Sequence, residues 1–125
     1  MNKHKVLYVD DEAINLALFK TILDEKYHIL TAEDGMSGLK ILSETNNVEV
    51  VFSDLRMPVM NGIEFINKAI KITPDAKFYI LTGFEITVEI QDALEKGIIK
   101  KYLRKPFNMN EISNEIDNVI DKGNP

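Results

Sequence analysis

The sequence predicts an α/β fold in which helices cover both faces of a five-stranded parallel sheet, a doubly wound arrangement. Short apolar runs alternate with stretches that carry apolar residues at helical spacing, and this alternation repeats five times along the chain. The first, third and fourth apolar runs are nearly free of polar residues, as parallel strands buried on both faces require.

The five expected strands are the apolar runs themselves. They span residues 6–9, 27–32, 48–53, 78–81 and 98–103. The second strand is more polar than the others, and the turn signal EDG follows it. The fifth carries most of the basic run KKYLRK at 100–105, for which we favour a solvated strand edge.

Five helices are expected after these strands. Apolar residues at helical spacing mark 14–23, 36–43, 63–72 and 88–96, and Gly97 is expected to cap the fourth helix. Asn108, with Glu111 three residues later, marks the start of the fifth. The tail KGNP at 122–125 is expected to fray. Because no linker or repeat interrupts residues 1–125, the chain is expected to form one domain.

Composition narrows the classes of function. The net charge of −5 argues against binding nucleic acid or an anionic membrane as the main role. The chain has no cysteine, which excludes disulfides, thiol chemistry and cysteine–metal sites. The N-terminus lacks a signal-peptide pattern, and no apolar segment approaches the length of a membrane span. We therefore expect a soluble, cytoplasmic protein.

Polar residues follow each of the four central strands at the point where the strand ends. Asp10 and Asp11 follow the first strand, Asp54 the third, Thr82 the fourth and Lys105 the fifth. In an open parallel sheet these carboxyl ends lie side by side, and ligands bind there. Three carboxylates, a hydroxyl and an ammonium group are therefore expected to converge.

Three neighbouring carboxylates need a counter-charge. Two unit charges about 4 Å apart cost roughly 4 kcal/mol at an effective dielectric of about 20, and Lys105 supplies one positive charge only. Oxygen ligands without His or Cys suit Mg²⁺, which we expect Asp10 and Asp11 to hold. Asp54 stands alone at the middle of the sheet and is the expected nucleophile toward phosphorus. Arg56 is expected to offer its backbone carbonyl to the metal.

Four motifs carry a family resemblance. These are VLYVDDE, VVFSDLRMPVMNG, FYILTG and YLRKPF, in this order and spacing. With them, the chain resembles the receiver domain of bacterial two-component response regulators over essentially its whole length. The resemblance implies a flavodoxin-like (CheY-like) (βα)5 fold with strand order 2-1-3-4-5. It implies that Asp54, with Mg²⁺ bound by Asp10, Asp11, Asp54 and the Arg56 carbonyl, accepts a phosphoryl group from a sensor histidine kinase or histidine phosphotransfer protein.

The resemblance also implies a switch. Thr82 would move toward the phosphoryl group, Lys105 would pair with it, and Tyr102 would turn inward. The surface made by the fourth helix, fifth strand and fifth helix, roughly 88–121, would then change. The Lys105–Pro106 peptide bond would be cis. A homodimer through this surface is left open, and the downstream effector cannot be identified from the sequence.

Two features of the sequence need separate mention beside this resemblance, and two other functions are weighed against it. GIIKKYLRK is one residue longer than in many receivers, which leaves the start of the fifth strand open. Phe84 and Arg56 are expected to flank the pocket mouth. A degenerate receiver would lack one of the acidic, Thr or Lys positions, and none is missing. A phosphohydrolase of the haloacid-dehalogenase type would need an acid where Arg56 stands, so we expect a switch rather than an enzyme.

Overall fold

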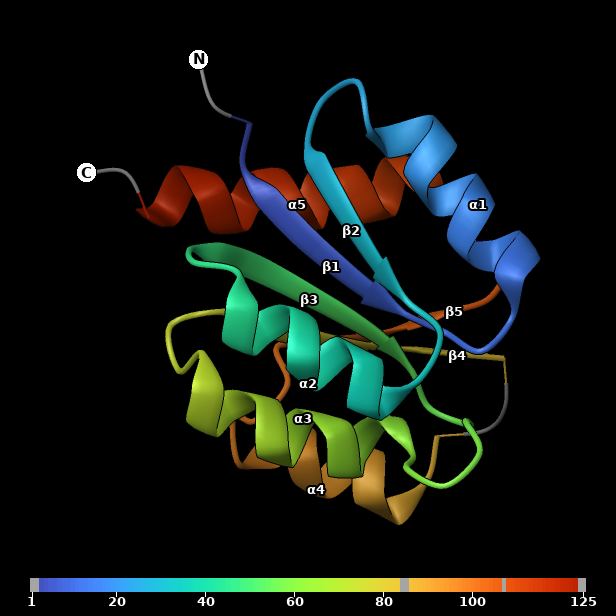
Figure 1. Cartoon of the computed structure of the whole chain (residues 1–125). Coiled ribbons are helices and arrows are strands. Elements are labelled where there is room, and N and C mark those ends of the chain that lie inside the picture. Colours follow the sequence, from blue (N-terminus) through green and yellow to red (C-terminus); the bar gives the residue numbers. More distant parts are fainter. Residues whose placement is uncertain (1–2, 84–85, 107, 124–125) are drawn as a thin grey trace.

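The chain folds around one parallel sheet in the order β2-β1-β3-β4-β5 (Figure 1). The computed structural model describes residues 3–83, 86–106 and 108–123. Its elements are β1 (Lys5–Val9), α1 (Ala13–Leu23), β2 (His28–Ala32), α2 (Gly35–Glu44), β3 (Val48–Asp54), α3 (Gly62–Ile72), β4 (Lys77–Thr82), α4 (Val88–Glu95), β5 (Lys101–Arg104) and α5 (Met109–Gly123). The predicted fold class and strand order are confirmed.

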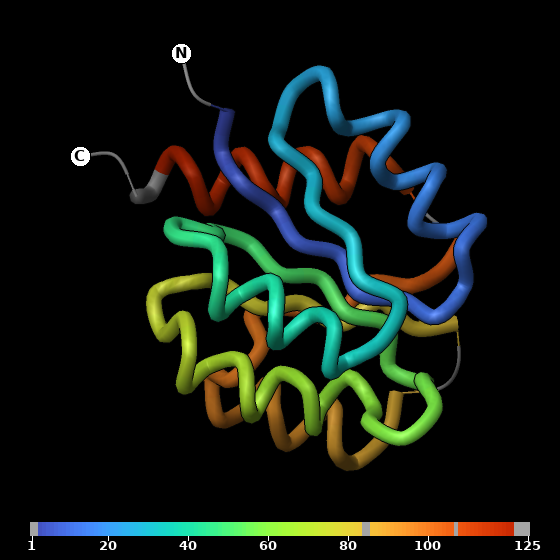
Figure 2. The backbone as a smooth tube through the Cα atoms, viewed as in Figure 1, coloured from blue at the N-terminus to red at the C-terminus, as the bar shows by residue number. Residues whose placement is uncertain are grey.

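Two hydrophobic cores lie on opposite faces of the sheet because successive strand side chains point to opposite sides. On β1, Leu7 and Val9 enter the core beneath α2, α3 and α4, whereas Val6 and Tyr8 enter the core beneath α1 and α5. The tube view shows the same two layers, with β1 beginning and α5 ending on one side of the molecule (Figure 2). The carboxyl ends of the strands therefore face the other side.

The fifth strand differs from its prediction. It begins at Lys101, not at residue 98. After Gly97, which has a φ of 73°, the N–H groups of Ile98 and Ile99 both donate to the carbonyl oxygen of Ala93, at 2.9 and 3.3 Å. These residues thus satisfy the C-terminal end of α4 and are not free to pair with β4. Gly97 ends the helix as predicted.

Side-chain caps begin most of the helices. The Asn61 side chain accepts a hydrogen bond from the Glu64 N–H, and the Glu64 side chain accepts one from the Asn61 N–H, a complete capping box for α3. At α5, Asn108 Oδ1 accepts from the Glu111 N–H at 3.1 Å, as predicted. Because α5 continues to Gly123, the first half of the expected tail is helical; residues 124–125 lie outside the described part.

A buried polar cluster joins α5 to the sheet. Glu115 is 6% exposed and accepts hydrogen bonds from the Tyr79 hydroxyl at 3.0 Å and from Lys101 Nζ at 2.7 Å. These bonds link α5 to both β4 and β5, so they fix the helix over the edge of the sheet. None of the helices in the described ranges has the length and apolar character needed to cross a membrane.

Candidate functional site

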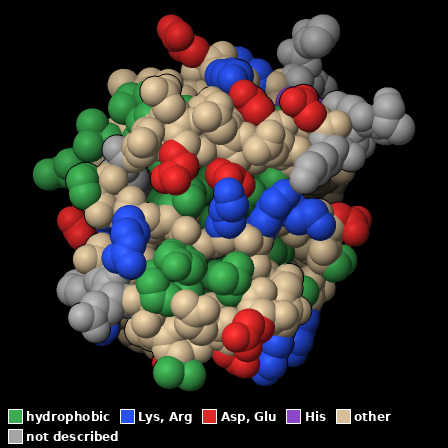
Figure 3. Space-filling view, turned by 180° about the vertical axis from the view of Figure 1, so that it is seen from behind, with side chains coloured by type: hydrophobic (Ala, Val, Ile, Leu, Met, Phe, Trp, Pro, Cys, Tyr) green, Lys and Arg blue, Asp and Glu red, His purple; other side chains and the backbone are tan. Residues whose placement is uncertain are grey.

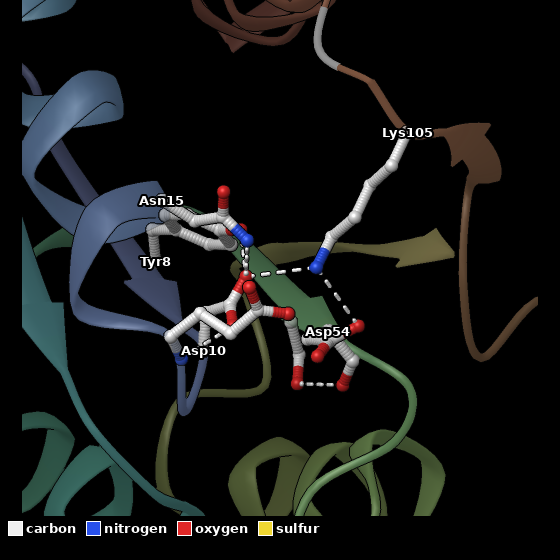
Figure 4. A network of polar contacts seen from close by, with 7 residues as sticks. Tyr8, Asp10, Asn15, Asp54 and Lys105 are labelled. Atoms are coloured by element: carbon white, nitrogen blue, oxygen red, sulfur yellow. Dashed lines mark hydrogen bonds and ion pairs between the residues drawn. The ribbon is translucent and has the colours of Figure 1, made fainter. Parts of the chain in front are cut away.

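The register of the parallel strands brings the acidic residues to one edge of the sheet. Val9 pairs with Ser53, so Asp10, directly after β1, and Asp54, the last residue of β3, lie side by side. Asp54 pairs with Leu81, which places Thr82 beyond it on β4. Figure 4 shows Asp10 and Asp54 pointing toward the Lys105 ammonium, which descends from the loop after β5.

The carboxylates form a compact cluster. Asp10, Asp11 and Asp54 each offer one oxygen, and these oxygens lie within 4.8 Å of one another. Asp10 is fully buried, Asp54 is 7% exposed and Asp11 is exposed. The donor set consists of hard oxygen atoms with an excess of negative charge, so these residues fit a Mg²⁺ ion.

Lys105 lies between two of the acids. Its Nζ is 3.2 Å from Asp54 Oδ1 and 2.9 Å from Asp10 Oδ2. The contact with Asp10 is the shorter of the two. Although burial lowers the pKa of Lys105, the hydrogen bond to Asp10 and the charge of Asp54 outweigh it and raise the pKa. The lysine is therefore held as an ammonium ion.

The two buried acids differ in their readiness to ionise. Burial raises the pKa of Asp54 to about 6; Lys105 opposes this shift, and the charge of Asp10 adds to it. Asp10 is also buried, but hydrogen bonds from the Tyr8 hydroxyl, the Glu12 N–H and Lys105 hold its pKa below the ordinary value. Asp10 is thus the firmly ionised acid, and Asp54 is the one whose charge is least compensated.

Thr82 and Tyr102 lie on the neighbouring strands. Thr82 is fully buried at the end of β4, and its carbonyl oxygen accepts the Lys105 N–H at 2.9 Å. Tyr102 is half-buried on β5, pairs with Ile80 and packs against the core beneath α3 and α4. The Lys105–Pro106 peptide bond is cis, as the resemblance implied.

The structure describes one of the two residues expected at the rim of the site. Arg56 follows β3 with its side chain exposed. It lines a hollow of about 400 Å³ together with Asn61, Thr87 and the loop after β3. Phe84, expected at the same rim, lies outside the described residues.

Sequence reasoning missed the partners of Asp10. The Tyr8 hydroxyl and the Asn15 side-chain amide both donate to Asp10 Oδ2 (Figure 4). One signal was available: Tyr8 is two residues before Asp10, and alternate residues of a strand share a face. The contact from Asn15, on the first turns of α1, depends on how that helix packs and has no such signal.

Comparison with known proteins identifies relatives across the whole domain. The chain matches the response regulator receiver domain model over residues 6–117. It is 30% identical over 118 residues to the response regulator receiver protein CpdR of Brucella abortus, covering 94% of this chain and 97% of CpdR. It is also 30% identical over 122 residues to the transcriptional regulatory protein GlrR of Escherichia coli, covering 98% of this chain but 27% of GlrR. The chain thus spans about a quarter of that longer relative.

Solved structures agree with this family. The response regulator protein TrrA of Thermotoga maritima, solved in complex with Mg²⁺-BeF, is 31% identical with a TM-score of 0.78, over 95% of this chain and 99% of that chain. The family match, the CpdR relationship and the shared strand order are concordant. The chain belongs to the response regulator receiver domain family.

Proposed function

We propose that the chain is a phosphorylation-dependent switch of a two-component phosphorelay, with residues 1–125 as one cytoplasmic receiver domain. Asp54 accepts the phosphoryl group from a phosphohistidine of a sensor histidine kinase or histidine phosphotransfer protein. The observation that carries this proposal is the position of Asp54: a nearly buried carboxylate, 3.2 Å from the Lys105 ammonium and clustered with Asp10 and Asp11.

The transfer is a displacement at phosphorus. A carboxylate oxygen of Asp54 attacks, the new P–O bond forms as the P–N bond to the donor histidine breaks, and the leaving imidazole nitrogen takes up a proton. Lys105 moves its hydrogen bond from Asp54 to a phosphoryl oxygen, and Thr82 donates its hydroxyl to another. Mg²⁺, when bound, neutralises negative charge on the phosphoryl oxygens. Asp10, Asp11, Asp54 and the Arg56 carbonyl would hold it.

The output follows from the loss of the Lys105–Asp54 contact and the attraction of Thr82 to the new phosphoryl group. Tyr102 then turns into the space beside β4, and the surface of α4, β5 and α5 changes. Seen from behind, Lys and Arg side chains gather over β5, where Lys101 and Arg104 are exposed (Figure 3). A downstream effector, or a second copy of the chain in a homodimer, would recognise this surface.

A small phosphodonor tests the proposal. With acetyl phosphate and Mg²⁺, the wild type is expected to gain one phosphoryl adduct, base-labile and detectable by mass spectrometry, because a nearby carboxylate and cations favour attack at phosphorus. Asp54→Asn is expected to abolish the adduct, and EDTA to suppress it. Asp75→Asn, an exposed acid before the start of β4, is the matched control and is expected to keep it.

Other outcomes would favour the rival functions. Repeated turnover of phosphoesters would indicate a phosphohydrolase. A folded protein that forms no adduct and shows no change with beryllofluoride would indicate an interaction module that does not use phosphate. Either result would overturn the proposed switch.

The phosphodonor must dock beside Asp54, and α1 offers an apolar surface there. Leu18 and Ile22 are 47% and 50% exposed, and with Lys105, Pro106 and Met109 they line a groove of about 290 Å³. Because Lys105 belongs to both the groove and the acidic cluster, a helix seated in the groove would lie next to Asp54. We propose the helix that carries the donor histidine as its occupant.

Leu18→Glu is expected to slow phosphotransfer from a sensor kinase at least about tenfold, since it places a charge in the apolar groove. Phosphorylation by acetyl phosphate is expected to stay unchanged. The measurement uses an autophosphorylated kinase that phosphorylates the wild type, chosen from a panel. Ile72→Glu, a similarly exposed apolar position at the end of α3, is the control. Equal kinase rates for Leu18→Glu and the wild type would place the docking surface elsewhere.

A further inference from the structure

The two oxygens of Asp10 differ in how many hydrogen-bond donors they already have. Its Oδ2 accepts hydrogen bonds from the Tyr8 hydroxyl, from Asn15 Nδ2 at 3.2 Å and from Lys105 Nζ at 2.9 Å, and its Oδ1 accepts the Glu12 N–H at 2.9 Å. A carboxylate offers about four lone-pair positions. Each oxygen has about two of them, so Oδ2, with three donors, is crowded, whereas Oδ1 has one donor only. A cation can therefore reach Asp10 Oδ2 only by displacing a donor.

The other two acids are more available. Asp11 is exposed and makes no hydrogen bond or ion pair with the part of the chain that the structure describes. Asp54 shares Lys105 with Asp10, so that lysine can shift wholly to Asp54 without leaving the cluster. A divalent cation therefore competes with hydrogen-bond donors mainly at Asp10.

Tyr8 is the donor that is least free to leave. Its side chain is fully buried on β1, and its ring packs against Phe19 of α1 with the ring centroids 4.5 Å apart. In a closed core the ring cannot swing away without opening the packing around it. Asn15 is half-buried on α1 and Lys105 is on a loop, so both can move more easily.

We propose that Tyr8 is a positioning residue that competes with the divalent cation for Asp10 Oδ2 and so weakens cation binding at the acidic cluster. This inference rests on the metal site of the proposed function. Its consequence is regulatory: the Tyr8 hydroxyl raises the Mg²⁺ concentration at which Asp54 becomes competent for phosphorylation.

Tyr8→Phe tests the inference with Mg²⁺ alone as the probe. Removing the hydroxyl leaves Oδ2 with two donors, of which Lys105 can shift to Asp54, so the Kd for Mg²⁺, measured by isothermal titration calorimetry at neutral pH, is expected to fall about tenfold. Asn15→Ala removes another of the three donors on the same oxygen and is expected to lower the Kd by a smaller factor. It keeps the test valid if Tyr8→Phe does not fold.

Tyr79→Phe is the matched control. Tyr79 is also a fully buried tyrosine on the same face of the sheet, but its hydroxyl donates to Glu115 instead of the acidic cluster. It is expected to lose stability with no change in the Kd for Mg²⁺. In urea unfolding, Tyr8→Phe should lose more stability in EDTA than in saturating Mg²⁺, whereas Tyr79→Phe should lose the same amount in both.

Distinct results separate this inference from the proposed function. If the wild type binds Mg²⁺ and both Tyr8→Phe and Asn15→Ala bind it equally or more weakly, the competition is absent and only this inference fails. If the folded wild type binds no Mg²⁺, the metal site of the proposed function fails with it.

Discussion

Gly62→Ala is expected to lower the free energy of unfolding by roughly 2–4 kcal/mol, because the new methyl group has no room. A Cβ atom at this position would lie 2.3 Å from the carbonyl oxygen of Asp54 and 3.0 Å from Ile80 Cδ1. The first of these atoms belongs to the backbone and cannot rotate away. Gly62 is required by this close approach of α3 to the end of β3.

The same substitution should disturb the site. The Gly62 N–H donates to the Leu55 carbonyl oxygen at 2.8 Å, which closes the loop directly after Asp54. Moving α3 outward to relieve the contact would shift the backbone of Asp54, so phosphorylation by acetyl phosphate is expected to slow as well.

Urea unfolding and the acetyl phosphate assay would measure both effects. Gly83→Ala is the stability control, since the nearest atom to its added Cβ is Lys105 Cβ at 3.9 Å. That variant is expected to stay within about 1 kcal/mol of the wild type. A Gly62→Ala protein as stable as Gly83→Ala would contradict the packing described at the start of α3.

Asp54→Asn is expected to stabilise the metal-free protein by about 1–3 kcal/mol at slightly alkaline pH. Burial raises the pKa of Asp54 from 3.8 to about 6, so the ionised acid is more costly in the folded than in the unfolded protein. This shift in pKa corresponds to about 3 kcal/mol of unfolding free energy, at about 1.36 kcal/mol per pKa unit. The asparagine variant also loses the contact with Lys105, which reduces its gain in stability.

The sign of the pH dependence follows from the same shift. A raised carboxyl pKa opposes folding above about pH 6, and this cost disappears as the pH falls toward 3.8, where the side chain is protonated in both states. The advantage of Asp54→Asn over the wild type should therefore be largest above pH 6 and vanish near pH 4. Unfolding in EDTA across this range measures it.

Asp75→Asn, exposed and away from the acidic cluster, should show no comparable gain. Added Mg²⁺ should favour the wild type, because it compensates the charge that the asparagine variant lacks. If Asp54→Asn were less stable than the wild type in EDTA above pH 6, the uncompensated charge inferred for this acid would be contradicted.

Local sequence determined the fold to a large degree. The alternation of apolar runs with helical spacing fixes the elements because both patterns depend only on neighbouring residues. The polar residues at the strand ends then follow, since parallel strands in one sheet bring their carboxyl ends together. Asp10, Asp11, Asp54 and Lys105 could be grouped on that basis before any coordinates were known.

Tertiary structure alone decided where β5 begins and which helix and loop residues contact Asp10. The N–H groups of Ile98 and Ile99 donate to the carbonyl oxygen of Ala93 and not to β4. Hydrophobic spacing does not indicate which carbonyl these N–H groups will bond. Lys105 divides between Asp10 and Asp54, and Asn15 reaches Asp10 from α1, because packing sets those distances. Sequence patterns specify which chemical groups meet at a sheet edge; the hydrogen bonds they share are settled only when helices and loops dock.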